Sequence, residues 1–205
     1  WFVVPFELDD YQIAKTLRWV IETNETHSDD ITLFTIFTTT DCNARCFYCF
    51  ELGRQRMHMS RETAYKTVEY IKAHCGGKTV RLRWFGGEPL YNAEVIDIIC
   101  KELRDSGIQF TSRMPTNGFL FDEELIQKAK NEWNLKSVQI TLDGREEAYN
   151  RTKAYIYKNV NAYQRVLSNI DSLLANKIFV YIRMNIDFHN INELHALTDE
   201  LAVRY

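Results

Sequence analysis

Short apolar runs, rich in β-branched and aromatic residues, alternate along this chain with longer segments of helical hydrophobic spacing. The runs predict five strands, at residues 31–39, 80–85, 108–114, 137–142 and 178–186. Helical spacing and capping residues predict helices at about 60–75, 93–106, 122–131 and 160–175, and a last one at a capping box formed by Asn190 and Glu193. Because a helix follows each strand, the pattern predicts a parallel α/β sheet with right-handed crossovers.

The polar residues of the last two predicted strands separate the two architectures that this alternation allows, an open doubly wound sheet and a (β/α) barrel. One face of these strands is polar at alternate positions, with Gln139, Thr141, Asp143, Arg183 and Asn185. A parallel strand covered by helices on both faces should be apolar on both. Buried polar groups need partners, and a barrel whose lumen holds a polar ligand would supply them.

The first thirty residues differ from the rest. An extended piece at residues 1–6, a short helix from about Asp9 to Glu22 and a polar linker are expected there. We therefore expect an N-terminal helix and linker segment at 1–30 and a barrel portion at 31–205. The chain begins at Trp1 rather than at Met, and we expect a piece of a longer protein.

The number and the distribution of charged residues argue against binding to nucleic acid and against a membrane-spanning helix. Among 205 residues, 25 are Lys or Arg and 28 are Asp or Glu, which gives a formal charge of −3. A charge so small and so mixed in sign does not indicate a nucleic-acid surface. The longest uncharged stretch, residues 31–40, is too short to cross a membrane as a helix. The chain is 45% hydrophobic, enough for a real core.

Three of the five cysteines lie within eight positions, as Cys42, Cys46 and Cys49, with the spacing C-x3-C-x2-C. This is a poor disulfide framework and suits a reducing cytoplasm. Iron–sulfur clusters are held by Cys thiolates, normally four, so three ligands leave one iron open to a small molecule. Taken alone, the loop also allows a zinc site or coincidence. The other two cysteines, Cys75 and Cys100, fit apolar helix positions and are expected in the core.

Each predicted strand ends in residues that can carry chemistry. The cysteine loop follows the first strand, and Gly86-Gly87-Glu88-Pro89 follows the second. Residues 116–118 and 143–144 follow the third and fourth, and Asn185 closes the fifth. Glycines let the backbone approach a ligand closely, and a carboxylate can accept a hydrogen bond from an ammonium group. The carboxyl ends of the strands are where barrel enzymes place their sites.

Together these motifs resemble the radical S-adenosylmethionine (SAM) enzymes, over about residues 31–205. The resemblance rests on the cysteine loop with an aromatic residue before its last Cys, the Gly-Gly-Glu-Pro turn some forty residues on, and the Thr-Leu-Asp-Gly strand end. It implies an α/β fold, a partial open (β/α)6 barrel of TIM type, here with about five units. It also implies a [4Fe-4S] cluster held by Cys42, Cys46 and Cys49, with SAM chelated to the fourth iron.

The resemblance extends to individual cofactor-binding residues. Tyr48 is expected near the adenine, and Thr141 in place of a more usual Ser. The methionine amino group is expected at Gly86, Gly87 and Glu88. The polar strand face adds Asp143, Arg183 and Asn185, and Arg183 is the preferred partner of the SAM carboxylate because Arg binds carboxylates in a bidentate manner. Arg151 is the second candidate for that carboxylate.

Within the superfamily, the strand ends at residues 138–144 and 182–187 look most like the branch that modifies peptides and proteins. That branch includes sulfatase maturases and peptide cross-linking enzymes, commonly with a Cys-rich (SPASM) extension. The resemblance implies hydrogen abstraction from a peptide or protein side chain by a 5′-deoxyadenosyl radical, in an anaerobic cytoplasm. An electron donor such as flavodoxin or ferredoxin is implied. The chain departs from the branch because it has no sixth strand and no Cys after Cys100.

Other functions share the motifs up to the fifth strand. A small-molecule radical SAM enzyme of cofactor biosynthesis is the second hypothesis. A barrel remnant that binds a partner without chemistry and a small zinc-binding module are the alternatives from other classes.

Overall fold

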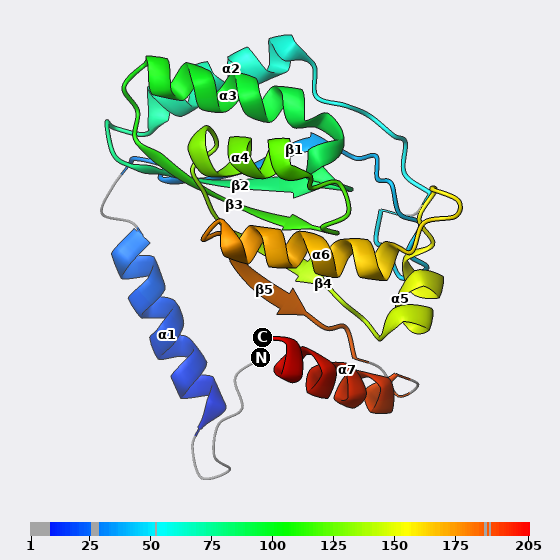
Figure 1. Cartoon of the computed structure of the whole chain (residues 1–205). Coiled ribbons are helices and arrows are strands. Elements are labelled where there is room, and N and C mark those ends of the chain that lie inside the picture. Colours follow the sequence, from blue (N-terminus) through cyan, green and yellow to red (C-terminus); the bar gives the residue numbers. More distant parts are fainter. Residues whose placement is uncertain (1–8, 26–28, 52, 187, 189) are drawn as a thin grey trace.

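A single parallel sheet forms the centre of the molecule (Figure 1). The computed structural model describes residues 9–25, 29–51, 53–186, 188 and 190–205. The strands follow the chain in the order β1-β2-β3-β4-β5, with every neighbouring pair parallel. A doubly wound sheet reverses its strand order at a switch point, so the sequential order is that of an open partial barrel. The strands are Leu33–Thr39, Val80–Gly86, Phe110–Thr116, Leu135–Thr141 and Phe179–Arg183.

Helices connect the strands and cover one face of the sheet, where Figure 1 shows α2, α3, α4 and α6. Their ends follow ordinary capping chemistry. The Ser60 side chain accepts from the backbone N of Thr63, and the Asp122 side chain accepts from that of Leu125, as expected for these caps. The helices are α1 Asp10–Glu25, α2 Arg61–His74, α3 Ala93–Asp105, α4 Glu123–Asn131, α5 Glu146–Lys153, α6 Ala162–Ala175 and α7 Ile191–Arg204, with a 3₁₀ turn η1 at Pro89–Asn92.

The core lies between the sheet and the helices. Trp84, Ile96, Ile140 and Val166 are among its fully buried side chains, and Cys75 and Cys100 lie in it as expected. Burial alternates along the strands, so the residues between the buried ones point away from the helices. We call this side the open face; it carries Leu33, Thr35, Phe37, Arg81, Arg83, Phe85, Thr111, Arg113, Pro115, Ser137, Gln139, Thr141, Phe179, Tyr181 and Arg183.

The structure differs from the sequence-based expectations in three places. The Asn190 capping box does not form: no side-chain cap bond is made at Asn190, and the Glu193 carboxylate instead accepts from the backbone N and Nε of Arg145, 2.9 and 3.1 Å away. Helix α5 was not expected, because its eight residues are almost all polar and show no apolar stripe. The fifth strand is also shorter than expected and ends at Arg183.

The N-terminal helix exists close to the expected place, as α1 at Asp10–Glu25. The extended piece expected at residues 1–6 lies outside the described residues. The division into 1–30 and 31–205 stays a prediction. Among the helices that the structure describes, none is long and apolar enough to span a bilayer.

Candidate active site

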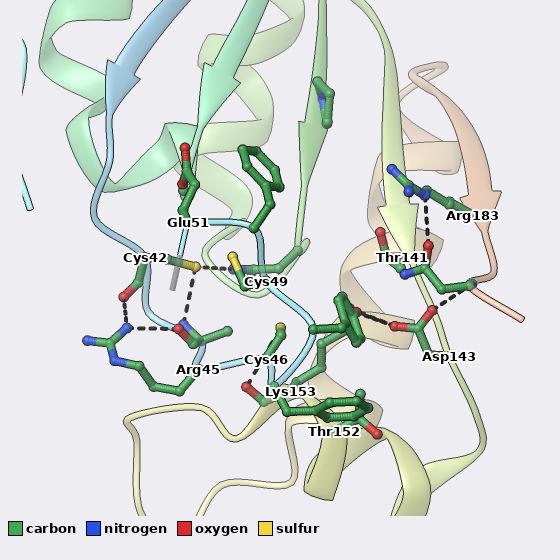
Figure 2. A pocket seen from close by; sticks show the side chains of 18 of the residues that line it. Cys42, Arg45, Cys46, Cys49, Glu51, Thr141, Asp143, Thr152, Lys153 and Arg183 are labelled. Atoms are coloured by element: carbon green, nitrogen blue, oxygen red, sulfur yellow. Dashed lines mark hydrogen bonds and ion pairs between the residues drawn. The ribbon is translucent and has the colours of Figure 1, made fainter. Parts of the chain in front are cut away.

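A cavity of about 1140 Å³ lies at the carboxyl ends of the strands. Figure 2 shows the cysteine side chains on one side of it and Thr141, Asp143 and Arg183 on the other. The topology explains the gathering, because parallel strands all end at the same edge of the sheet. Every predicted site residue except Glu88 lines this cavity: Cys42, Cys46, Tyr48, Cys49, Gly86, Gly87, Thr141, Asp143, Arg183 and Asn185.

Backbone contacts hold the cysteine loop, which runs between β1 and α2. A turn closes within it, where the N–H of Cys49 donates to the carbonyl of Cys46 at 3.1 Å. The Arg45 guanidinium donates to the carbonyls of Cys42 and Ala44. The backbone N of Arg45 donates to the carbonyl of Lys153 at the end of α5, 2.8 Å away. The loop is therefore tied to a helix more than a hundred residues later in the chain.

The three thiols are free and partly exposed to the cavity. The Cys42 sulfur accepts from the backbone N of Ala44 at 3.3 Å and from the Asn117 amide at 3.7 Å. Hydrogen bonds of this kind favour a thiolate. Burial, with the Glu88 carboxylate, nevertheless raises the pKa of Cys42 to about 12, and burial also raises the pKa of Cys46. A metal that binds these sulfurs must therefore displace their protons.

In the described part of the chain, no three His, Cys, Asp or Glu side chains gather closely enough to hold one metal ion. A tetrahedral zinc centre would bring its thiolates within about 3.8 Å of one another. An iron–sulfur cube has a different requirement, because each thiolate binds its own iron and the sulfurs stay farther apart.

The Gly-Gly-Glu turn packs directly on the start of the cysteine loop. A Cβ on Gly86 would lie 2.0 Å from the carbonyl oxygen of Thr39, and one on Gly87 would lie 2.4 Å from that of Asp41. The N–H of Gly87 donates to Thr39 at 3.0 Å, and that of Glu88 to Asp41 at 2.9 Å. Any larger residue would separate β2 from the loop, so these glycines set the position of the cysteines.

The Glu88 carboxylate is buried and faces β3. It accepts from the Thr116 hydroxyl and from the backbone N of Asn117, both at 2.8 Å, and from that of Leu90 at 3.2 Å. Burial raises its pKa to about 7, although these hydrogen bonds act to lower it. The carboxylate thus holds the end of β3, and contact with the methionine amino group stays a prediction for Glu88.

A trio of polar side chains joins the cysteine loop to β4 and α5; Lys153 and Asp143 are buried, whereas Tyr48 is 40% exposed. Lys153 Nζ donates to the Tyr48 hydroxyl at 2.6 Å and to Asp143 Oδ2 at 3.1 Å, and Tyr48 donates to the same carboxylate oxygen. The backbone N of Asn185 donates to Asp143 Oδ1 at 2.9 Å. Burial raises the pKa of Tyr48 above its usual value, and Asp143 adds to this shift, so the phenol stays protonated.

Lys153 is the site residue that sequence reasoning missed. Its side chain is 4% exposed, and the Cys46 sulfur lies 4.0 Å from its backbone carbonyl oxygen. The available signal was a lysine that follows a strand-end Asp-Gly by ten residues, in a segment with no predicted structure. Without α5 in the prediction, nothing showed that this lysine turns inward.

The two arginine candidates for the SAM carboxylate lie in different surroundings. Arg183 is paired with Thr141 in the β4–β5 register, and its Nε donates to Asn185 Oδ1 at 3.1 Å. Arg151 is mostly exposed and lies 3.6 Å from Glu147 on the same helix. Both line the cavity, so the assignment of the carboxylate to Arg183 stays a prediction.

Comparison with known proteins fits this geometry. The family model of the radical SAM superfamily matches residues 36–201. The chain belongs to the radical SAM superfamily. Its members are enzymes that use a [4Fe-4S] cluster and SAM. One curated relative, named probable GTP 3′,8-cyclase, from Methanococcus maripaludis strain C6, is 32% identical over 114 residues. This match covers 56% of the chain and 37% of the relative.

Solved radical SAM-type structures share the fold. The structure titled anSMEcpe with bound AdoMet superimposes with a TM-score of 0.68 at 19% identity, over 83% of this chain and 49% of that one. Streptococcus suis SuiB bound to the precursor peptide SuiA gives a TM-score of 0.60 at 13% identity, over 97% and 44%. At such identities the likeness shows the fold alone. The chain spans about half the length of these proteins or less.

The residues of this radical SAM domain fit the two cofactors by their chemistry. Three thiols from one short loop border the cavity, and an amide N–H already donates to one sulfur. Beside them lie the two glycines of the turn, and a polar wall formed by Thr141, Arg183 and Asn185. This donor set suits a cluster on the loop side and a ligand with amino, carboxylate and hydroxyl groups on the strand side.

Proposed function

We propose that this chain is the SAM-binding barrel of an enzyme that removes a hydrogen atom from a peptide or protein side chain. Cys42, Cys46 and Cys49 hold the cluster in this proposal, and SAM lies between the cluster and the polar ends of β4 and β5. When bound, the cluster supplies the electron that cleaves SAM to methionine and a 5′-deoxyadenosyl radical, which abstracts the hydrogen. The electron comes from an external donor such as flavodoxin or ferredoxin, in an anaerobic cytoplasm.

Each side chain has a defined part in this proposal. Gly86 and Gly87 keep the turn close to the cysteine loop and present backbone groups to the methionine moiety. Arg183 binds its carboxylate, and Thr141 and Asn185 donate or accept hydrogen bonds at the cofactor's polar groups. Lys153 and Asp143 hold Tyr48 over the side of the cavity where the adenine is expected. Glu88 keeps the end of β3 in place.

One observation carries the proposal: a single cavity contains the three thiols and all but one of the predicted cofactor residues. Its volume of about 1140 Å³ is above the roughly 300–1,000 Å³ usual for one drug-sized ligand. A cofactor and part of a second substrate therefore fit together. The solved structures that share the fold include Streptococcus suis SuiB bound to the precursor peptide SuiA, which supports a peptide substrate.

A second candidate is a small-molecule reaction of cofactor biosynthesis. The observation in its favour is the sequence similarity to proteins named GTP 3′,8-cyclase. In that case the substrate would be a nucleotide, and the same three thiols and glycine turn would hold the cluster and SAM.

Anaerobic reconstitution with iron, sulfide, SAM and a strong reductant tests the shared chemistry. The wild-type chain should contain about four irons per chain and release 5′-deoxyadenosine. Cys46→Ala should lose both, whereas Cys100→Ala, a matched change at a buried cysteine outside the loop, should keep its iron. Release of 5′-deoxyadenosine that persists in Cys46→Ala would contradict the proposal, and zinc without iron and sulfide would favour a zinc module.

The substrate class is tested by substrate-dependent cleavage. Deuterium transfer from a labelled peptide into 5′-deoxyadenosine supports the peptide reaction. Transfer from labelled GTP, with none from peptides, supports the nucleotide reaction instead.

A further inference from the structure

Three arginines lie side by side on the open face of the sheet. Arg81 and Arg83 alternate on β2 with the buried Leu82, and Arg113 lies directly opposite Arg83 in the β2–β3 register. We call these three residues the arginine patch. Arg83 also lines the cavity, so the patch continues from the proposed active site toward the amino ends of the strands.

The patch carries positive charge that the sheet does not neutralise. No strand position of the open face holds Asp or Glu. Among the ion pairs of the described residues, none involves Arg81, Arg83 or Arg113. Arg83 contacts the Phe85 ring instead, 5.5 Å from its centroid. Three like charges on neighbouring positions repel one another and raise the local potential for anions.

The spacing of the patch matches an extended peptide. Residues two apart on a strand are separated by about 6.6 Å, and neighbouring strands by about 4.8 Å. Side chains at positions i and i+2 of an extended peptide, laid along β2, have the same spacing as Arg81 and Arg83. Phe37 and Phe85, whose ring centroids are 5.0 Å apart, add apolar surface beside the patch.

We propose that the arginine patch binds acidic side chains of the peptide substrate, at alternate positions of an extended segment that leads into the cavity. This inference rests on the proposed peptide substrate and names its chemistry: carboxylates two residues apart. Arginine suits this role because its planar fork pairs with carboxylates and is always charged. The patch gives the peptide its direction along β2, so that the residue beyond the acidic segment reaches the cavity.

Peptide binding to the anaerobically reconstituted chain with SAM tests this proposal. The probe is a fluorescein-labelled twelve-residue peptide with Glu at every second position in a Ser/Thr background, and the matched peptide carries Gln instead. The double variant Arg81→Gln/Arg113→Gln should weaken binding of the Glu peptide about tenfold and leave the Gln peptide unchanged. The charge-matched control is Lys72→Gln/Lys130→Gln on helices α2 and α4, which should bind the Glu peptide as the wild type does.

Two outcomes would overturn the proposal. One is equal binding of the Glu and Gln peptides by the wild type. The other is displacement of the Glu peptide by inorganic pyrophosphate at concentrations where free glutamate has no effect, which would assign the patch to a phosphate ligand. Release of 5′-deoxyadenosine without peptide should be the same in the double variant and the wild type. If the wild type released no 5′-deoxyadenosine, the proposed function would be contradicted. The comparison of peptide binding would still test the arginine patch in that case.

A second measurement does not depend on any ligand. Arg113→Gln removes one of three mutually repelling charges, so the thermal midpoint of unfolding should rise at low salt. The increase should disappear at high salt, because exposed charges are then screened. A lower midpoint at low salt would show that Arg113 has a stabilising partner and is not free for a substrate.

Discussion

The two faces of the sheet differ sharply although the same strands make both. Toward the helices, Leu82, Trp84 and Met114 are almost wholly buried. Their chain neighbours Arg81 and Arg113 point to the open face and are exposed. The strand period of two therefore divides each strand between stability and function. The face of the sheet to which a side chain points, more than its position along the chain, indicates whether a substitution will change stability or function.

The prediction with the largest expected effect concerns the buried ion pair between Lys153 and Asp143. Lys153→Met should destabilise the protein by about 3–5 kcal/mol, because it leaves the buried Asp143 side chain without its ammonium partner. The double variant Lys153→Met/Asp143→Asn should recover part of this loss. Chemical denaturation of the single and double variants measures both effects. A loss below about 1 kcal/mol in the single variant would mean that water reaches the pair.

Adjacent residues on β2 give the most direct comparison of the faces. Leu82→Ala should cost about 2–5 kcal/mol, because it leaves a cavity against the helices. Arg81→Ala, one residue away, should change the free energy of unfolding by at most about 0.5 kcal/mol. Urea denaturation of the two variants measures the difference. Similar losses in both variants would contradict the view that only the face toward the helices carries the stability of the strand.

Glu88 predicts a pH dependence of stability. Its folded pKa of about 7 lies above the ordinary value of 4.5. The folded state therefore keeps a proton that the unfolded state has lost between these values, so this contribution to stability is present below pH 4.5 and is lost as the pH rises to about 7. Wild-type stability should fall relative to Glu88→Gln across this range. Denaturation curves of both proteins at several pH values test this, and a constant difference would contradict it.

The smallest expected effect concerns a helix end on the covered side. Asp122→Ala removes the side chain that accepts from the backbone N of Leu125 at the start of α4. The expected cost is about 1 kcal/mol. Ser60→Ala at the start of α2 should cost a similar amount, because its cap has the same form. Thermal unfolding of both variants measures the loss. No effect in either would mean that water replaces these caps without cost.

The sequence was most informative where a local pattern has one physical solution. Strand runs of β-branched residues and the caps at Ser60 and Asp122 were confirmed. Helix α5 escaped prediction because its inward side chains are few, with Tyr149 and Lys153 buried. The capping box failed because Glu193 has a better partner in Arg145, 48 residues away along the chain. Long-range partners of this kind leave no periodic signal.

The sequence by itself determined the order of the strands and of the helices other than α5, the three-cysteine loop and the glycine turn, because these depend on residue type and short spacing. The tertiary structure decided which side chains meet. It turned Glu88 toward β3, buried Lys153 against Tyr48 and Asp143, and set Arg113 beside Arg83. The physical reason is that strand register and chain packing join residues far apart in sequence, and no local preference records such pairs.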